Sequence, residues 1–236
     1  MIETHLKALA RANFFAGIDP VHAEKLIDCL SPKIKLYEKN EIIIKAGDSV
    51  QSIGIILSGR ARAYAEDLDG NQTLMTNLTP LSVFGEILVS TRTHKSPVTV
   101  YAASDVTVAF IEYDKTFSIC SEGCDAHREF MQNMLKAIGD KYFQLFDRIN
   151  ILREKSLRDK ILAYLHVLGE KEKGRGEAYR QVKLPFSKTT LAEYLLANRS
   201  ALSRELQRMI NDGIIKMNGR EIILLSSDSG YRSQYI

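Results

Sequence analysis

Seven apolar residues between positions 131 and 152 are separated by alternating steps of four and three, and this repeat constrains the fold most strongly. They are Met131, Leu135, Ile138, Tyr142, Leu145, Ile149 and Leu152. A period of about 3.5 residues places them in one narrow stripe of an α-helix, as in a left-handed coiled coil. The sequence therefore predicts a helix over 125–152, roughly 40 Å long, whose stripe pairs with a second copy of the chain. The alternative is an amphipathic helix packed on its own domain.

Residues 187–210 predict two short helices joined by a tight turn. Ser187 is a candidate N-cap, because its hydroxyl can accept a hydrogen bond from a free amide of the first turn. Ala197-Asn198 supplies the turn, since Asn tolerates unusual backbone angles. Apolar residues recur at helical spacing in both segments: Leu191, Tyr194, Leu195, Leu202, Leu206, Met209 and Ile210. The pattern is typical of a helix-turn-helix, which inserts its second helix into the DNA major groove. An ordinary helical hairpin with a charged, solvated face is the alternative.

A β-hairpin is predicted directly after the second helix. Gly213 ends that helix, and Asn218-Gly219 is a strong signal for a two-residue hairpin turn between two strands. The second strand is expected over Glu221–Leu225, which is rich in β-branched and apolar residues. A helix-turn-helix followed by such a hairpin is a winged helix.

Positive charge is concentrated in the same part of the chain. Residues 153–225 hold fifteen Lys or Arg and nine Asp or Glu, a net charge of +6, whereas residues 1–152 hold sixteen and nineteen, a net charge of −3. DNA binding requires cations that neutralise phosphates. The charge distribution therefore favours double-stranded DNA as a partner of residues 153–225.

Specific side chains can be assigned to that interface. We expect Arg199 and Arg204 to read guanine edges or to anchor phosphates, and Ser200 and Ser203 to contact bases or phosphates. Lys188 and Thr189 begin the first helix of the motif, where the helix N-terminus also favours a phosphate. Lys216 and Arg220 flank the tip of the hairpin, and Arg220 is the candidate phosphate contact there. Since two copies related by a two-fold axis reach successive major grooves about 34 Å apart, the expected DNA site is an inverted repeat.

The first half of the chain has a different pattern. Short apolar strands are expected in 34–37, 42–44, 52–57, 60–66, 74–78, 98–103 and 106–111, and Gly-containing turns separate several of them. Many short strands at such intervals predict an antiparallel barrel or sandwich. Phe130, Met134, Phe143 and Phe146 widen the apolar stripe of the following helix, so one flank of that helix should also pack on this domain.

Three segments together resemble the cyclic-AMP receptor protein/Fnr family of regulators: AGDSVQSIGIILSGRARAYAEDLDGNQ (46–72), VFGEILV (83–89) and NRSALSREL (198–206). The resemblance covers about residues 12–225. It implies an α+β fold with an N-terminal, cupin-like β-roll of the cyclic-nucleotide-binding type, a long dimerisation helix and a C-terminal winged helix. We expect the β-roll and its helical lead in 1–124, the dimerisation helix in 125–152, the winged helix in 153–225 and a polar tail in 226–236.

The resemblance also implies a transcription factor switched by an effector in the β-roll. Family members that bind cyclic nucleotides hold the ribose with a Gly-Glu pair and the cyclic phosphate with an Arg-Ser pair. This chain has Gly85-Glu86, but Ser96-Pro97 stands at the Arg-Ser positions. Proline supplies neither an amide hydrogen nor a hydroxyl, and the guanidinium is missing. Cyclic AMP is therefore not the expected effector, and Gly85, Glu86, Lys95 and Ser96 are candidate contacts for another one.

Two other sensor chemistries of the family can be weighed on residue content. An iron–sulfur cluster is not expected, because its ligands would be four cysteines and the chain has only Cys29, Cys120 and Cys124. The spacing of Cys120 and Cys124 fits a thiol pair or two ordinary cysteines. Haem, which some family members use to sense nitric oxide or carbon monoxide, remains an alternative with His94 as the candidate axial ligand.

Other classes of function are weaker. A cupin-like enzyme would need clustered metal ligands, yet residues 34–112 contain one histidine, His94. No catalytic or metal-binding motif is found. A regulator without an effector stays open, and RNA polymerase is a candidate protein partner. The chain lacks a secretory signal and a run of about 18–20 apolar residues, so we expect a cytoplasmic protein without a membrane partner.

Overall fold

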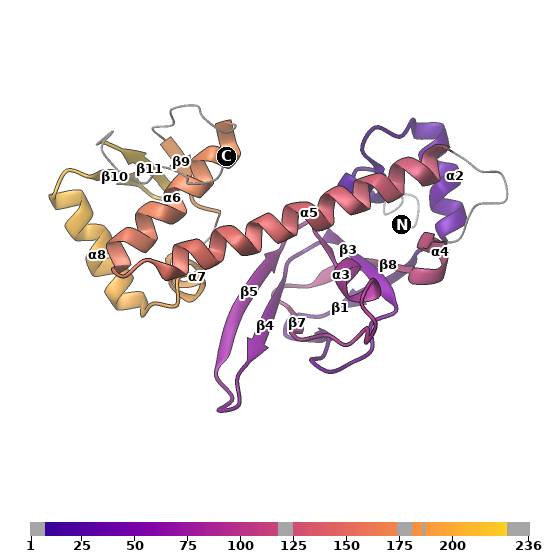
Figure 1. The fold of residues 1–236 in the computed structure, drawn as a ribbon, viewed down its shortest axis with the longest axis horizontal. Helices are drawn as coiled ribbons and strands as arrows, with labels where there is room; N and C mark the ends of the chain where they lie inside the picture. The colour runs from indigo at the N-terminus through magenta and orange to yellow at the C-terminus, as the bar shows by residue number, and fades with distance from the viewer. Residues whose placement is uncertain (1–7, 118–124, 174–180, 186, 226–236) are drawn as a thin grey trace. The chain divides into compact units, whose positions relative to one another are not determined.

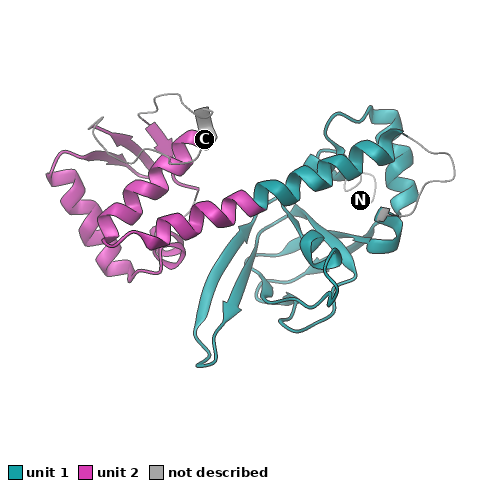
Figure 2. Ribbon diagram, in the orientation of Figure 1, with its two compact units in different colours: residues 1–141 teal, residues 142–236 magenta. Residues whose placement is uncertain are grey.

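The computed structural model describes residues 8–117, 125–173, 181–185 and 187–225 of the 236-residue chain. Contacts divide the chain into two compact units, residues 1–141 and 142–236 (Figure 2). The boundary between them falls inside one continuous helix, α5 (Asp125–Arg153). The finer division into 1–124, 125–152 and 153–225 stays a prediction, and the predicted polar tail lies outside the described residues.

Short helical segments begin unit 1. They are η1 (Asn13–Phe15) and α2 (Pro20–Leu30), and α3 (Glu86–Val89) and α4 (Tyr113–Phe117) follow later in the chain. Helix α2 begins where it does because the Asp19 carboxylate accepts a hydrogen bond from the Val21 amide at 3.0 Å. Proline at its first position has no amide that would need a partner.

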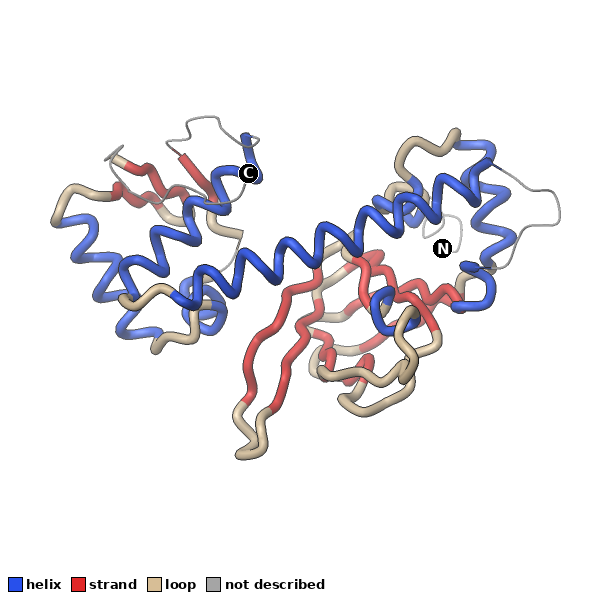
Figure 3. The backbone as a smooth tube through the Cα atoms, viewed as in Figure 1, coloured by secondary structure: helices blue, strands red, loops and turns tan. Residues whose placement is uncertain are grey.

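The described strands of unit 1 form the β-roll (Figures 1 and 3). They are β1 (Lys33–Tyr37), β2 (Ile42–Ile44), β3 (Ser52–Ser58), β4 (Ala61–Glu66), β5 (Gln72–Leu78), β6 (Val83–Phe84), β7 (Thr99–Ala102) and β8 (Val106–Glu112). One sheet has the order β1-β8-β3-β6 and the other β2-β7-β4-β5, and all of their pairings are antiparallel. The predicted antiparallel β-roll is thereby confirmed.

The core of unit 1 explains why α5 starts beside the roll. Phe130 and Met134 are buried in the same cluster as the inward-facing residues of the strands, and Phe130 packs edge-on against Phe14 with ring centroids 5.4 Å apart. This confirms the expectation that one flank of the long helix packs on the N-terminal domain for Phe130 and Met134. It was wrong for Phe143, which is 53 % exposed, and Phe146 is not part of this cluster. Asn133 adds polar contacts, because its amide donates to the carbonyl oxygens of Phe14 and Ala16 at 3.2 and 2.7 Å.

A different face of α5 is open to solvent in the single chain. Leu135 is 70 % exposed, Leu145 50 % and Ile149 48 %, and Tyr142 is exposed as well. All four belong to the predicted stripe, whereas Met131, Ile138 and Leu152 are half-buried. Several large apolar side chains left exposed on one helix are typical of an interaction site.

Unit 2 continues from α5 with α6 (Leu157–Lys173), β9 (Gln181–Lys183), α7 (Lys188–Tyr194), α8 (Arg199–Asn211), β10 (Ile215–Asn218) and β11 (Glu221–Leu224). The predicted hairpin is β10-β11, and Gly219 in its turn has a φ of 60°. Strand β9, which the sequence analysis did not predict, adds a third strand beside β11. The helices pack on this sheet through a separate apolar cluster that includes Ile161, Leu191 and Leu206.

Candidate nucleic-acid interface and effector region

Two side-chain caps define the helix-turn-helix. The Ser187 hydroxyl accepts a hydrogen bond from the Thr190 amide at 3.2 Å, which confirms the predicted N-cap of α7. The Asn198 carboxamide accepts from the Ser200 amide at 2.9 Å and begins α8. The strained residue of the turn is Leu196, with a φ of 52°, and not Asn198, whose φ is −70°. Asn198 is used for its capping oxygen instead.

Helix α8 has one buried and one exposed face. Leu202, Leu206 and Met209 are buried in the core of unit 2, as the spacing predicted. The predicted DNA contacts Arg199, Ser200, Ser203 and Arg204 are all exposed. A helix that presents arginines and small hydroxyl residues on one open face can supply both phosphate and base contacts.

Three further polar residues extend the exposed face of α8 toward its C-terminus. Gln207, Arg208 and Asn211 are exposed, and the Gln207 amide donates to the Asn211 side chain at 3.1 Å. They follow Ser203 or Arg204 by four or eight residues, which is about one or two helical turns, so helical spacing alone would have found them. Ser200 differs from its neighbours, because its hydroxyl donates to the Asn198 carboxamide at 2.5 Å and is therefore used within the cap.

The remaining predicted phosphate contacts lie at the ends of elements. Lys188 and Thr189 are exposed in the first turn of α7, and Arg220 is exposed in the turn between β10 and β11. All of the predicted DNA contacts thus belong to unit 2 and are accessible. Their role at the DNA remains a prediction.

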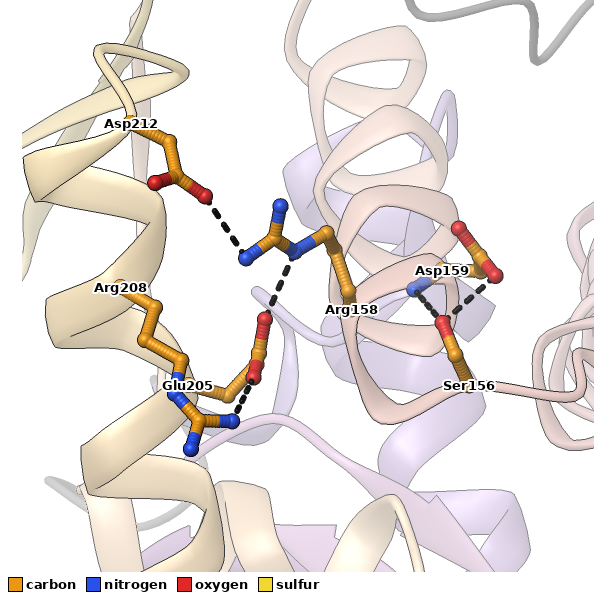
Figure 4. A network of polar contacts seen from close by, with 6 residues as sticks. All are labelled: Ser156, Arg158, Asp159, Glu205, Arg208 and Asp212. Atoms are coloured by element: carbon orange, nitrogen blue, oxygen red, sulfur yellow. Dashed lines mark hydrogen bonds and ion pairs between the residues drawn. The ribbon is translucent and has the colours of Figure 1, made fainter.

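An ion-pair network fixes the inner side of α8 (Figure 4). Arg158, near the start of α6, contacts the Glu205 carboxylate at 2.7 Å and the Asp212 carboxylate at 2.8 Å. Glu205 also accepts from Arg208 at 3.2 Å. Hydrogen bonding from Arg158 is the main reason that the pKa of Glu205 lies below its ordinary value. Arg158 therefore ties the middle and the end of α8 to α6.

A lower pH should weaken the ion pair between Arg158 and Glu205. Because the pKa of Glu205 is lower in the folded chain than in the unfolded one, its contribution to stability is present above a pH of about 4.5 and is lost as the pH falls further. We expect Arg158→Met to lower the unfolding midpoint of unit 2 at neutral pH and to flatten its decline between about pH 5 and 3. Calorimetry across that range measures both effects. Arg208→Met is the control, because Arg208 is the lesser partner and should change the decline less; an unchanged acid dependence in Arg158→Met would contradict the assignment.

In unit 1, the predicted Gly85-Glu86 pair lies at the start of α3. Gly85 has a φ of 83°, and a Cβ added there would lie 3.0 Å from the Ser52 carbonyl oxygen, so both conformation and space require glycine. Glu86 is buried, with 1 % of its surface exposed, and its Oε1 lies 2.6 Å from Lys141 Nζ of α5. Lys141 also donates to the Val83 carbonyl oxygen at 2.6 Å. Glu86 Oε2 has no hydrogen-bond partner among the described residues.

The other two candidate effector residues lie in the loop before β7. Ser96 is buried, and its hydroxyl donates to the Val98 carbonyl oxygen at 2.7 Å, so it is used inside the loop. Lys95 is exposed and its backbone pairs with Ser49. The loop and Gly85 thus border the same segment, 49–53, but no direct contact joins Glu86 to Lys95 or Ser96 among the contacts described.

The Glu86–Lys141 pair should respond strongly to the loss of its cation. Removing one partner of a buried ion pair leaves an uncompensated charge, and since Lys141 is one-third exposed we expect Lys141→Met to cost about 3 kcal/mol. The double variant Glu86→Gln/Lys141→Met should regain most of that loss. Denaturant unfolding, with hydrogen exchange to localise the change to unit 1, measures it. A double variant that is no more stable than Lys141→Met would show that the two side chains act separately.

A cavity of about 300 Å³ opens elsewhere in the roll. Its lining includes Lys35, Tyr37, Val50 and Phe110, and burial raises the pKa of the Tyr37 hydroxyl. None of the four candidate effector residues lines it. The sequence analysis did not predict this cavity, because its residues come from separate strands.

The candidate cofactor ligands are dispersed. His94 is half-buried with a φ of 52°, and its ring packs against Tyr113 with centroids 6.0 Å apart. Cys29 is exposed, and Cys120 and Cys124 lie outside the described residues. Within the described ranges, no three His, Cys, Asp or Glu side chains are grouped so as to hold a metal ion. No described helix is long and apolar enough to cross a membrane.

Comparison with known proteins agrees with this architecture. Residues 34–122 match the cyclic nucleotide-binding domain, and residues 159–228 match the Crp-like helix-turn-helix domain. The chain is 24 % identical over 201 residues to the transcriptional activator protein FnrA of Stutzerimonas stutzeri, covering 85 % of this chain and 80 % of that protein. It is 23 % identical over 198 residues to the anaerobic regulatory protein of Haemophilus influenzae, covering 84 % and 75 %.

The fold is also similar to that of a solved structure. A CooA mutant from Carboxydothermus hydrogenoformans superposes with a TM-score of 0.65 at 21 % identity, covering 84 % of this chain and 86 % of that one. Both domain matches occur in the same order as the β-roll and the winged helix described above, and the relatives named are regulators. The chain is a DNA-binding transcriptional regulator of the cyclic-AMP receptor protein/Fnr family.

Proposed function

We propose that this regulator binds an inverted-repeat DNA site as a homodimer and that an effector bound beside Glu86 in the β-roll controls the binding. The observation that carries the dimer is the exposed stripe Leu135, Tyr142, Leu145 and Ile149 on α5. Seven apolar positions at coiled-coil spacing continue through this stripe, and burial against a second copy would remove them from water. A two-fold axis along α5 then presents two copies of α8 to one duplex.

The DNA side of the proposal rests on the exposed face of α8. Arg199, Ser203 and Arg204 are accessible, while the opposite face is held by the core and by Arg158. In this proposal Arg204 contacts bases and so specifies the sequence. The phosphate contacts, which position the protein on the duplex, come from Lys188, Thr189 and Arg220.

The effector side rests on Glu86. A buried carboxylate offers an acceptor to a ligand hydroxyl or amine, since one oxygen lies on Lys141 and the other has no hydrogen-bond partner in the described part of the chain. The Ser96 hydroxyl is turned into its own loop, and Pro97 follows it. These features support an effector other than cyclic AMP, because the groups that would hold a cyclic phosphate are missing. An effector that prefers one of two states of α5 would shift the DNA affinity.

Haem remains the alternative sensor chemistry, with His94 as the ligand to test. The absorption spectrum of the purified protein after haem addition decides it: a shifted Soret band that His94→Ala abolishes would support haem. A regulator controlled only by its amount would show no effector dependence of DNA binding.

Selection of duplexes from a random pool by the full-length protein tests the proposal. The expected product is an inverted repeat whose half-sites lie about one helical turn apart, 10–10.5 base pairs. Sedimentation should give a dimer both free and on DNA. A monomer that selects a single half-site, or no enrichment of any sequence, would contradict the proposal.

A further inference from the structure

Arg148 of α5 is buried, although neighbouring residues in the sequence are exposed to solvent. Arg148 is 5 % exposed, while Leu145 and Ile149, three residues before it and one after, are about half exposed. In this part of the helix the apolar stripe and the buried cation therefore lie on different faces. Arginine is seldom buried to this degree, because a charge removed from water must be compensated by specific contacts.

Two contacts join Arg148 to Tyr194, a residue of the DNA-binding motif. Its guanidinium carbon lies 4.6 Å from the centroid of the Tyr194 ring, and its Nη2 donates to the Tyr194 carbonyl oxygen at 3.4 Å. Burial lowers the pKa of Arg148 and raises that of Tyr194. The guanidinium over the ring, together with a hydrogen bond to the backbone, restrains Tyr194 in position and direction.

Tyr194 lies directly before the turn that joins the two helices of the helix-turn-helix. It is the last residue of α7, and the turn that follows leads through Leu196 and Ala197 to Asn198, the N-cap of α8. The turn is itself fixed, since the Ala197 amide donates to the Ala192 carbonyl oxygen at 2.9 Å and Asn198 caps α8. A residue of α5 that restrains Tyr194 thus helps to set where the turn, and hence α8, begins relative to the second half of α5.

Packing alone does not require this chemistry. An aliphatic side chain would fill the same space without the desolvation of a guanidinium, but it would leave the Tyr194 ring with the Tyr164 ring, 5.4 Å away between centroids, and without a cation. The directional contacts are what Arg148 adds. Building on the proposed dimer, we propose that Arg148 is a positioning residue that fixes α8 relative to the dimerisation helix and so sets the spacing between the two DNA half-sites.

Half-site spacing is the property that such a link controls. Inserting one base pair moves a half-site by about 3.4 Å and rotates it by about 34–36° around the duplex axis. A rigid connection between the dimer axis and α8 cannot follow that rotation, whereas a loosened one can. Contacts within each half-site are unaffected by the link, because Arg148 is buried and distinct from the exposed face of α8.

The test compares full-length wild type and Arg148→Met on the selected inverted repeat, on versions with one or two central base pairs inserted or removed, and on an isolated half-site. We expect the wild type to reject altered spacings and Arg148→Met to reduce that discrimination about tenfold, with half-site affinity unchanged. Tyr194→Leu should reproduce the effect, and the double variant should add nothing to it. Arg153→Met is the matched control, since Arg153 is an exposed arginine at the end of the same helix.

The outcomes separate the inference from the proposed function. If the wild type binds the isolated half-site as tightly as any inverted repeat, the inverted-repeat dimer is wrong and the inference falls with it. If the wild type prefers the inverted repeat but binds every spacing equally, only the inference is overturned. If the wild type discriminates and a folded Arg148→Met discriminates equally well, only the inference is overturned. Should Arg148→Met not fold, Arg148→Lys and Tyr194→Leu decide: each removes the contact between the guanidinium and the ring, and full spacing discrimination in both would refute the role of Arg148.

Discussion

Leu145→Lys should convert the dimer into a monomer at micromolar concentration. Leu145 lies in the middle of the exposed stripe of α5. In the proposed dimer interface the variant would replace two leucines by two lysines, which would lie opposite each other. Loss of the apolar contacts alone is worth about 4 kcal/mol or more for two copies, which raises the dissociation constant about a thousandfold. Sedimentation velocity measures the change directly.

Gln144→Lys is the matched control for this prediction. Gln144 is exposed and precedes Leu145, but it lies outside the heptad stripe. The same charge placed there should leave the dimer intact. DNA binding should follow dimerisation, because two linked half-sites bind more tightly than one. A Leu145→Lys protein that remains dimeric would show that the exposed stripe is not the dimer interface.

Arg204→Ala should abolish the selection of one inverted repeat. A bidentate arginine–guanine contact is worth about 1–3 kcal/mol of discrimination, and a dimer makes it twice, so preference for the selected site should fall about a hundredfold or more. Competition gel shifts against an unrelated duplex measure this ratio. Retention of full site preference by Arg204→Ala would remove Arg204 from base reading.

Lys188→Ala provides the contrasting result on the same duplexes. Lys188 begins α7 and is assigned to phosphate, so its loss should weaken binding to every sequence alike. The slope of log affinity against log salt should decrease in magnitude by about 0.9 per lost contact, or about 1.8 for the dimer. Lys39→Ala, which removes an exposed charge from the β-roll, should leave both preference and slope unchanged. A sequence-dependent loss in Lys188→Ala would instead assign Lys188 to base reading.

The elements that could be predicted from the sequence are those set by local periodicity. The buried face of α8, the Ser187 cap and the turn at Gly219 depend on residues within a few positions of one another. Helix α5 could be predicted equally well, because an apolar repeat of 3.5 residues over three heptads fits an α-helix. Phe130 and Met134 were correctly placed on the β-roll because they widen the stripe on one side.

What could not be predicted are contacts between distant segments. Glu86 and Lys141 are 55 positions apart in the sequence, and neither carries a local signal for the other. Arg148 lies between Leu145 and Ile149 in the sequence but outside the apolar stripe. A charged side chain at such a position is ordinarily expected to face water, so its burial against Tyr194 was not predicted. Strand β9 has three residues and is recognised only by its pairing with β11.

The network around Arg158 changes how the basic character of the C-terminal half should be understood. Two carboxylates on α8 and its end hold this guanidinium on the inner side of the helix, and Glu205 also draws Arg208 toward it. A cation balanced by acids within the protein adds to a tally of basic residues without attracting a polyanion. The number of sodium or potassium ions displaced when the duplex binds should therefore follow the cations that face the solvent, and it should be smaller than the composition of residues 153–225 suggests.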